Sequence, residues 1–318
     1  MKYHIYFHDD FDGVVSAVVF WDFFRKRGDK LLSFNPINYE PNLKKNWADF
    51  KFKTPFILVD FMYHPKAVWW FDHHETSFIN PDWKKKYKDD DTHAFNPSFK
   101  SGCGLTLAYL KKKYKYKAPR HIEYLVKWGD IIDSAGYKNA KQVVERKGPV
   151  LQWMSFLNSL DRTNQKTYQA RIAGIIKQLT TKPIREIINQ PVIAKKIKEN
   201  MADIKISITA FKNSAILKNK VVFIDKTNNE ISGSHFLAFY LYPKSFYSVS
   251  ISKYSGYYHI SAGDNPWNRA RGHDINIGEI MTKYGGGGHK GIGGTEKRSK
   301  DEILKVADEV VKYLNANG

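Results

Sequence analysis

The sequence is short of cysteine, because Cys103 is the only one among 318 residues. No disulfide can form within the chain, and the lack of Cys-x-x-Cys pairs argues against a structural zinc site. Long apolar runs are also missing, since none approaches the roughly 18 residues of a membrane span. The first ten residues, MKYHIYFHDD, are mixed and soon acidic, which does not fit a secretory signal. These absences predict a cytoplasmic protein without a membrane partner.

Acidic side chains are the minority charge, with 32 Asp and Glu against 51 Lys and Arg and a formal net charge of +19. A field of that sign favours polyanions such as nucleic acid, although a lysine-rich solvated surface gives the same count. Lysines interleave with aromatics at 83–88 (WKKKYK) and 111–117 (KKKYKYK). Each stretch fits either a surface that holds phosphates and bases or a solvated helix face.

Three segments of strand length alternate with helical patterns: 2–7, which is alternating and aromatic-rich, and the apolar runs at 55–61 and 67–74. This alternation predicts an α/β fold with a parallel sheet and helices on both faces. Ionisable side chains lie at the ends of these runs, where open α/β sheets place their ligands. They are His8, Asp10, Asp12, Asp60, Asp72, His73 and His74, joined by Asp130 from a helical segment.

Carboxylates gathered at one sheet edge repel one another unless a cation neutralises them. Oxygen ligands combined with imidazoles suit Mn²⁺ better than Mg²⁺. Two ions bridged by a carboxylate would lower the pKa of a shared water and turn it into a nucleophile for phosphorus. Taken singly, each motif also fits an acidic turn, a helix N-cap or a surface cluster, so the hypothesis depends on their combination.

The pattern changes in the second half of the chain. Residues 140–215 are mostly helical and amphipathic, with Pro191 interrupting them before a long helix near 195–212. From Val221 strands reappear, and residues 246–252 and 257–263 alternate like a hairpin. We predict three parts: a metal-binding domain over 1–190, a helical linker over 191–216, and a smaller α/β domain over 217–318.

Four stretches, in this order, resemble the motifs of the DHH phosphoesterase superfamily. They read HDDFDGVVSA (8–17), ILVDF (57–61), FDHHE (71–75) and WGDIID (128–133). INIGEIMTKYGGGGHKGIGG (275–294) resembles the signature of the associated C-terminal domain, called DHHA1. The superfamily includes RecJ-type exonucleases, short-oligonucleotide ribonucleases, cyclic-dinucleotide phosphodiesterases, manganese pyrophosphatases and exopolyphosphatases. The resemblance implies a metal-dependent phosphoesterase.

The resemblance also implies a set of metal ligands, in which Asp60 bridges two ions. The set is His8, Asp10, Asp12, Asp60, His73 and Asp130. Asp130 is preferred to Asp133 because GDIID lies closer to the RecJ form of the motif. His8 is included as a ligand, the alternative being that it points into the sheet or orients Asp10. Asp9 is expected to face away by strand alternation.

Catalytic roles follow from the same pattern, in which Asp72 orients the site and His74 faces the substrate phosphate. An acid can fix the tautomer of one imidazole, and a second imidazole can donate to a phosphoryl oxygen. The C-terminal domain is expected to hold the substrate through Gly286, Gly287, Gly288, His289, Lys290, Arg269 and Arg271. Glycines let a backbone approach a phosphate, and arginines offer bidentate forks, whereas a flexible turn and a solvated loop are the alternatives.

We therefore predict a two-metal phosphodiesterase, with Mn²⁺ as its ions and Mg²⁺ as the alternative. It would act as an exonuclease on short single-stranded RNA or DNA oligonucleotides and release mononucleotides, since no extra nucleic-acid-binding module is evident. Four alternatives stay open: a cyclic or linear dinucleotide phosphodiesterase, a RecJ-like single-stranded DNA exonuclease, a small phosphoanhydride or nucleotide phosphatase, and a non-catalytic nucleic-acid-binding protein on a decayed hydrolase fold. The oligomeric state is also open, a homodimer included.

Overall fold

The computed structural model describes residues 1–39, 43–228, 235–268 and 275–318. The chain forms two compact units. Unit 1 comprises Met1–Gly136 and Gly148–Ile197, and unit 2 comprises Tyr137–Lys147 and Lys198–Gly318. The chain therefore enters unit 2 briefly before it returns to unit 1, which no change in composition indicated. The predicted division at residues 190 and 216 remains a prediction.

Unit 1 contains a five-stranded sheet in which every neighbouring pair is parallel, as predicted. Its strands are β1 (Lys2–His8), β2 (Lys30–Ile37), β3 (Phe56–Val59), β4 (Trp69–Asp72) and β5 (His93–Phe95), in the order β2-β1-β3-β4-β5. Because all strands run the same way, their carboxyl ends meet at one edge. The strand-end residues of the sequence motifs are thereby brought together.

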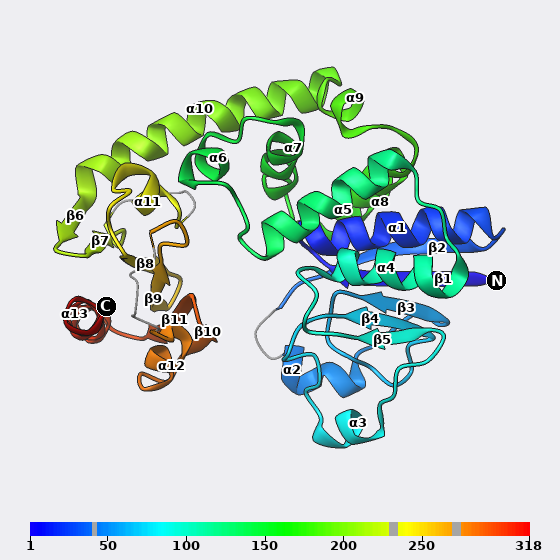
Figure 1. Cartoon of the computed structure of the whole chain (residues 1–318), viewed down its shortest axis with the longest axis horizontal. Coiled ribbons are helices and arrows are strands. Elements are labelled where there is room, and N and C mark those ends of the chain that lie inside the picture. Colours follow the sequence, from blue (N-terminus) through cyan, green and yellow to red (C-terminus); the bar gives the residue numbers. More distant parts are fainter. Residues whose placement is uncertain (40–42, 229–234, 269–274) are drawn as a thin grey trace. The chain divides into compact units, whose positions relative to one another are not determined.

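Helices cover both faces of this sheet (Figure 1), with α1, α4, α5 and α8 on one side and α2 and α3 on the other. They are α1 (Phe11–Lys26), α2 (Leu43–Asn46), α3 (Pro81–Lys86), α4 (Gly102–Tyr114), α5 (Arg120–Asp133), α7 (Pro149–Asn158), α8 (Gln165–Thr181) and α9 (Ile184–Ile188), with a 3₁₀ turn at Trp47–Asp49. Helix α1 is apolar on most of its surface and is buried almost throughout, as such a helix must be. An aromatic cluster that includes Tyr6, Trp47 and Trp70 fills the opposite face. The site is thus built on a rigid core.

Unit 2 contains a six-stranded sheet that is antiparallel except for the pair β7–β8. Its strands are β6 (Ala215–Lys218), β7 (Val221–Asp225), β8 (Tyr247–Tyr254), β9 (Tyr257–Asp264), β10 (Gly287–His289) and β11 (Ile292–Lys297), in the order β10-β11-β9-β8-β7-β6. The predicted hairpin is confirmed as β8 and β9. The helices are α6 (Ala140–Glu145), α11 (Leu237–Leu241), α12 (Ile277–Thr282) and α13 (Lys300–Asn317), and α10 (Pro191–Ser214) spans the end of unit 1.

Trp267 explains why Tyr137–Lys147 belongs to unit 2. Its indole nitrogen donates to the carbonyl of Tyr137 at 2.7 Å, and its ring lies 5.3 Å from that of Phe236. These contacts make Trp267 an anchor within unit 2.

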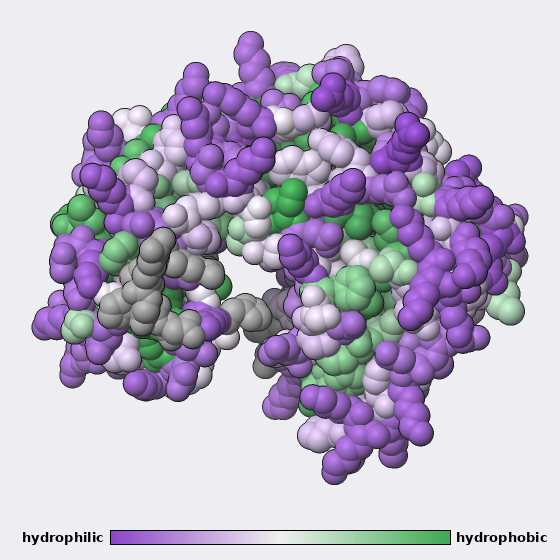
Figure 2. Space-filling view, viewed as in Figure 1, coloured by the Kyte–Doolittle hydropathy of each residue, from purple (hydrophilic) through white to green (hydrophobic). Residues whose placement is uncertain are grey.

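The two basic stretches, 83–88 and 111–117, lie at the C-terminal ends of helices α3 and α4. Lysines fill the last turns of α3 and α4, where positive charge complements the helix dipole. Lys111 pairs with Glu123 and Lys113 with Asp91, each at 2.5 Å. These contacts favour solvated helix ends over a phosphate-binding surface, and Figure 2 shows hydrophilic residues over most of the visible face. None of the helices among the described residues is long and apolar enough to cross a membrane.

Candidate metal centre

The junction of β1 and α1 carries three ionisable residues of the first motif. Strand β1 ends at His8, Asp10 caps α1 by accepting the Gly13 N–H at 2.9 Å, and Asp12 lies in the first helical turn. A Cβ at Gly13 would lie 2.1 Å from the carbonyl oxygen of His8, so the tight junction requires glycine. This turn brings the side chains to the carboxyl edge of the sheet.

Asp60 follows β3 in a left-handed backbone conformation, with φ of +54°, which is uncommon for a residue other than glycine. Its side chain is buried, and neither carboxylate oxygen has a hydrogen-bond partner among the described residues. Burial, and after it the charges of Asp12 and Asp10, raise the pKa of Asp60 well above its usual range. A buried carboxylate without donors is costly, and a bound cation would remove that cost.

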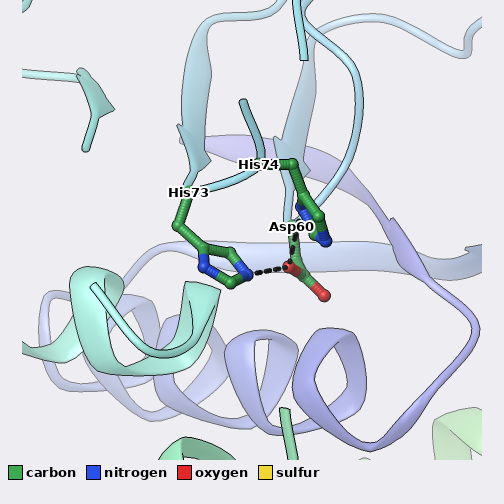
Figure 3. A group of neighbouring side chains, drawn as sticks. All are labelled: Asp60, His73 and His74. Carbon is green, nitrogen blue, oxygen red and sulfur yellow. Dashed lines mark ion pairs between the residues drawn. The ribbon is translucent and has the colours of Figure 1, made fainter. Parts of the chain in front are cut away.

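Two imidazoles face this carboxylate (Figure 3). His73 Nε2 lies 3.7 Å and His74 Nδ1 lies 3.8 Å from the same oxygen of Asp60. These distances are too long for hydrogen bonds. The distance from His73 Nε2 to Asp60 suits two atoms that share one ion, since each metal–ligand bond is about 2.0–2.2 Å long. The geometry therefore leaves room for a metal between the His73 ring and the acid, whereas His74 Nδ1 lies closer to Asp72.

His73 is oriented by the backbone. Its Nδ1 lies 3.1 Å from the carbonyl oxygen of Phe99, so the proton on Nδ1 is donated there and Nε2 is left as a ligand. Nε2 also lies 3.2 Å from Asp133 and 3.7 Å from Asp12. Burial lowers the pKa of His73, but Asp133 and Asp12 outweigh it and raise the pKa to about 9. The acids that hold this proton would equally hold a divalent ion.

Asp72 is fully buried and surrounded by donors. One carboxylate oxygen accepts the His73 N–H at 2.8 Å and lies 2.7 Å from His74 Nδ1, and the other accepts the Ser77 hydroxyl. With both oxygens engaged, Asp72 is placed to orient His74. Burial lowers the pKa of His74, yet Asp72 raises it above the usual value overall. A protonated His74 can donate through Nε2, as the predicted role requires.

Three overlapping groups of ligand atoms occur among the described residues, and the atoms of each lie within 4.8 Å of one another. The groups are Asp60, His73 and His74; His8, Asp10 and Asp60; and Asp12, His73 and Asp133. Asp60 and His73 each belong to two groups. This sharing fits two ions held side by side by a common ligand. His8 Nδ1 lies 2.9 Å from Asp10 and 3.9 Å from Asp60, so the structure brings it to the centre.

Asp12 is fixed by the start of α4. Its carboxylate accepts the backbone N–H groups of Gly102 and Cys103, where the helix dipole favours negative charge. A Cβ on Gly102 would lie 2.7 Å from an oxygen of Asp60, so glycine is needed for this approach. Burial, then Asp133 and Asp10, raise the pKa of Asp12 to about 6. Residues 101–104 thus form part of the scaffold of the centre.

Asp130 and Asp133 have different partners in the structure. Asp130 accepts the hydroxyl of Ser101, the N-cap of α4, at 2.6 Å, and it joins none of the three ligand groups. Asp133, the last residue of α5, reaches His73 instead. The two acids lie about one helical turn apart on one face of α5, so their spacing alone could not separate them. These distances favour Asp133 over Asp130 as a candidate metal ligand.

The predicted substrate contacts all belong to unit 2. Arg269, Arg271 and the side chain of His289 lie outside the described residues, and Lys290 is exposed. At two of the glycines, close packing leaves no space for a side chain. A Cβ on Gly286 would lie 2.1 Å from the carbonyl oxygen of Gly294, and a Cβ on Gly288 would lie 2.3 Å from that of Ile292. Only Gly287 of these three opens onto free space among the described atoms. The phosphate-binding role of this stretch remains a prediction.

Sequence reasoning missed Tyr39. Its ring stacks on Phe61 at 4.6 Å and meets the edge of His8 at 5.2 Å, and the residue is 39% exposed. Burial, then Asp72 and Asp60, raise the pKa of Tyr39, which keeps its hydroxyl protonated as a donor. No sequence signal marked it, because it follows β2, a strand that the pattern did not reveal.

Comparisons with known proteins bear on the fold. No protein-family model matches the chain, and no curated protein matches it. Among solved structures, a pGpG-specific phosphodiesterase from Vibrio cholerae is similar over 100% of both chains, with a TM-score of 0.76 and 20% sequence identity. The DHH domain of a member of a family of ribosomal proteins matches over 98% of this chain and 86% of its own, with a TM-score of 0.57 and 12% identity.

RecJ from Thermus thermophilus, solved with Mn²⁺, is also similar, with a TM-score of 0.53 and 12% identity. This chain is covered completely and spans about half of RecJ, namely 52%. At these identities the similarity concerns the arrangement of helices and strands. Together with the strand order and the grouped DHH-type side chains, it shows that this chain has the fold of the DHH superfamily.

Proposed function

We propose that this protein is a metal-dependent phosphodiesterase that hydrolyses short single-stranded oligonucleotides from one end to mononucleotides. The observation that carries the proposal is Asp60, a buried carboxylate without hydrogen-bond donors at the junction of the ligand groups. A bound cation would stabilise a strained and unpaired acid in that position. The donor set of carboxylates and imidazoles suits Mn²⁺, with Mg²⁺ as the alternative.

Two sets of residues would hold the ions. His8 and Asp10 would bind one ion. Asp12, His73 and Asp133 would bind the other ion, and Asp60 would bind both. When bound, the metals would supply an activated water and neutralise the phosphate. Asp72 holds His74 through Nδ1, and the protonated Nε2 donates to a phosphoryl oxygen or to the leaving group. Lys290 and the open Gly287 are proposed as substrate contacts of unit 2.

Linear dinucleotides are a second candidate substrate. The support is the similarity, over both whole chains, to a phosphodiesterase specific for pGpG. By contrast, RecJ is about twice as long as the matched region.

The test is hydrolysis of end-labelled RNA and DNA from 2-mers to 20-mers, alongside a cyclic dinucleotide, with Mn²⁺, with Mg²⁺ and with a chelator. We expect mononucleotide release with Mn²⁺, fastest on the shortest chains, and none with the chelator. Preference for the 2-mer alone would select the dinucleotide candidate. Binding without turnover, unaffected by Asp72→Ala and His73→Ala, would instead indicate a nucleic-acid-binding protein.

The matched pair Asp133→Asn and Asp130→Asn tests the revised ligand. We expect Asp133→Asn to weaken Mn²⁺ binding about 10–100-fold or more, because the ion that His73 binds loses its Asp133 ligand. Asp130→Asn should leave Mn²⁺ affinity within about threefold and cost roughly 1 kcal/mol of stability through its bond to Ser101. Titration calorimetry and thermal unfolding measure the two effects. The reverse pattern would restore Asp130 as the ligand.

A further inference from the structure

Asp9 is a buried acid that the proposed chemistry does not use. It lies between β1 and α1, its side chain is 6% exposed, and it joins none of the three ligand groups of the described residues. One carboxylate oxygen accepts the Nε–H of Arg162 at 2.9 Å, and the other accepts the hydroxyl of Tyr168. Both oxygens are therefore engaged within the chain, and Asp9 faces away from the ligand groups, as strand alternation predicts.

Arg162 holds this acid from a distant part of the chain. It lies between α7 and α8, 153 positions after Asp9. Its Nη1 also donates to the carbonyl oxygens of Asn158 and Leu160, at 3.4 and 3.3 Å, at the end of α7 and just beyond it. Its guanidinium lies 5.1 Å from the centre of the Tyr168 ring, near the start of α8. Arg162 thus ties the carboxyl end of β1 to the segment between two helices.

The residues on either side of Asp9 are both candidate metal ligands. His8 and Asp10 belong with Asp60 to one ligand group, and the side chains of His8 and Asp10 meet at 2.9 Å. Consecutive Cα atoms lie about 3.8 Å apart and are joined by planar peptide units, so a movement of Asp9 also moves both neighbours. The N–H of Asp9 donates to the carbonyl of Ile37 in β2 at 2.8 Å. Backbone and side chain of Asp9 are therefore both held in place.

The ion pair of Asp9 and Arg162 has more value for geometry than for stability. Taking two charges out of water costs about as much free energy as their attraction returns, so apolar side chains could fill the same space as well. Partners that orient metal ligands are different, because their loss typically costs about 10–100-fold in metal affinity or activity. The location of this pair, beside two ligands, therefore indicates its role.

We propose that Asp9 and Arg162 are positioning residues, which hold His8 and Asp10 in the geometry that binds a metal ion. The inference rests on the proposed function and deepens it, because it identifies residues that act through the ligands without touching the ion or the substrate. Loss of either residue should weaken the binding of the ion at His8 and Asp10 and leave the other ion in place.

The test is Mn²⁺ titration calorimetry on Asp9→Asn and Arg162→Met, which remove the two sides of the pair. We expect each variant to bind one of the two Mn²⁺ ions about tenfold or more weakly than the wild type. A purely electrostatic role predicts opposite signs instead, because removing a cation would strengthen Mn²⁺ binding and removing an acid would weaken it. Tighter or unchanged Mn²⁺ binding by Arg162→Met would therefore overturn the inference.

Asp22 provides the matched control, because it is a buried acid of α1 that is also held by an arginine and a tyrosine. Its oxygens accept from Arg25 at 2.8 Å and from the Tyr116 hydroxyl at 2.8 Å. It lies roughly 18 Å along the helix from Asp10, at about 1.5 Å per residue. Asp22→Asn should lower the melting temperature, as Asp9→Asn does, but leave Mn²⁺ affinity within about twofold. An equal loss of Mn²⁺ affinity in Asp22→Asn would assign the effect to general destabilisation and overturn the inference.

The double variant Asp9→Asn/Arg162→Met serves if the unpaired acid left by Arg162→Met prevents folding. It contains no unpaired acid, so its melting temperature should lie closer to that of the wild type. It should still bind one Mn²⁺ ion about tenfold more weakly, and wild-type Mn²⁺ affinity in this variant would leave the pair a merely stabilising role. Because the readout is metal binding, a wild type that binds Mn²⁺ but hydrolyses no diester would contradict the proposed function alone.

Discussion

The Asp60→Asn variant is expected to lose diester hydrolysis by at least about 10³-fold while it stays folded. Both Asp60 oxygens are unpaired, and one faces His73 and His74 at 3.7 and 3.8 Å. A neutral amide has a single oxygen and cannot bridge two ions. Asparagine tolerates the left-handed backbone of this position, so the change removes charge without adding strain. Single-turnover hydrolysis at saturating Mn²⁺ measures the loss.

Thermal unfolding supplies the second readout for Asp60→Asn. Because the pKa of Asp60 is raised in the folded, metal-free protein, its contribution to stability is present at low pH and is lost as the pH rises through that pKa. At neutral pH the metal-free variant should therefore melt above the metal-free wild type. Added Mn²⁺ should raise the melting temperature of the wild type but not that of the variant.

Asp49→Asn is the matched control, because Asp49 is an exposed acid of the same unit. It should leave hydrolysis and the Mn²⁺-induced stabilisation unchanged. An Asp60→Asn variant that still hydrolyses diesters and is still stabilised by Mn²⁺ would show that this acid is not a metal ligand. The two-ion centre would then have to be abandoned.

Replacing His74 with alanine should lower kcat by about 10²–10⁴-fold, the usual contribution of a positioned proton donor. The Mn²⁺ affinity should fall only a few-fold, because Asp72 holds the Nδ1 side of this ring at 2.7 Å. His73→Ala should instead weaken Mn²⁺ binding strongly, since Nε2 of His73 is shared by two ligand groups. Calorimetric Mn²⁺ titration and kcat at saturating metal separate these effects.

Asp72→Asn is the companion variant to His74→Ala. It removes the charge that orients the ring and raises its pKa, so it should reproduce much of the loss in kcat with Mn²⁺ still bound. Should His74→Ala lose Mn²⁺ affinity as severely as His73→Ala, His74 would be a ligand and the proton-donor role would be wrong. If His74→Ala and Asp72→Asn both kept a normal kcat, neither residue would take part in catalysis.

The parallel sheet of unit 1 could be predicted because β3 and β4 are continuous apolar runs with an acid at or just after their ends. Strand β2 was not predicted, because its sequence KLLSFNPI neither alternates between apolar and polar residues nor forms a continuous apolar run. It is an edge strand, and Pro36 near its end is tolerated there because that side of the strand needs no ladder hydrogen bond. Because β2 was missed, Tyr39, which follows it, was missed as well.

The sequence by itself determined which chemical groups are present and that they lie near strand ends, because these features are local. Hydrophobic runs, turn glycines and caps such as Ser299, which accepts the Glu302 N–H, depend on a few neighbouring residues. Only the tertiary structure decided that Asp133 reaches His73, that Asp60 is left unpaired, and that Asp9 turns to Arg162 across 153 positions. Such contacts depend on how helices α5 and α8 pack on the sheet, and no local pattern encodes that packing.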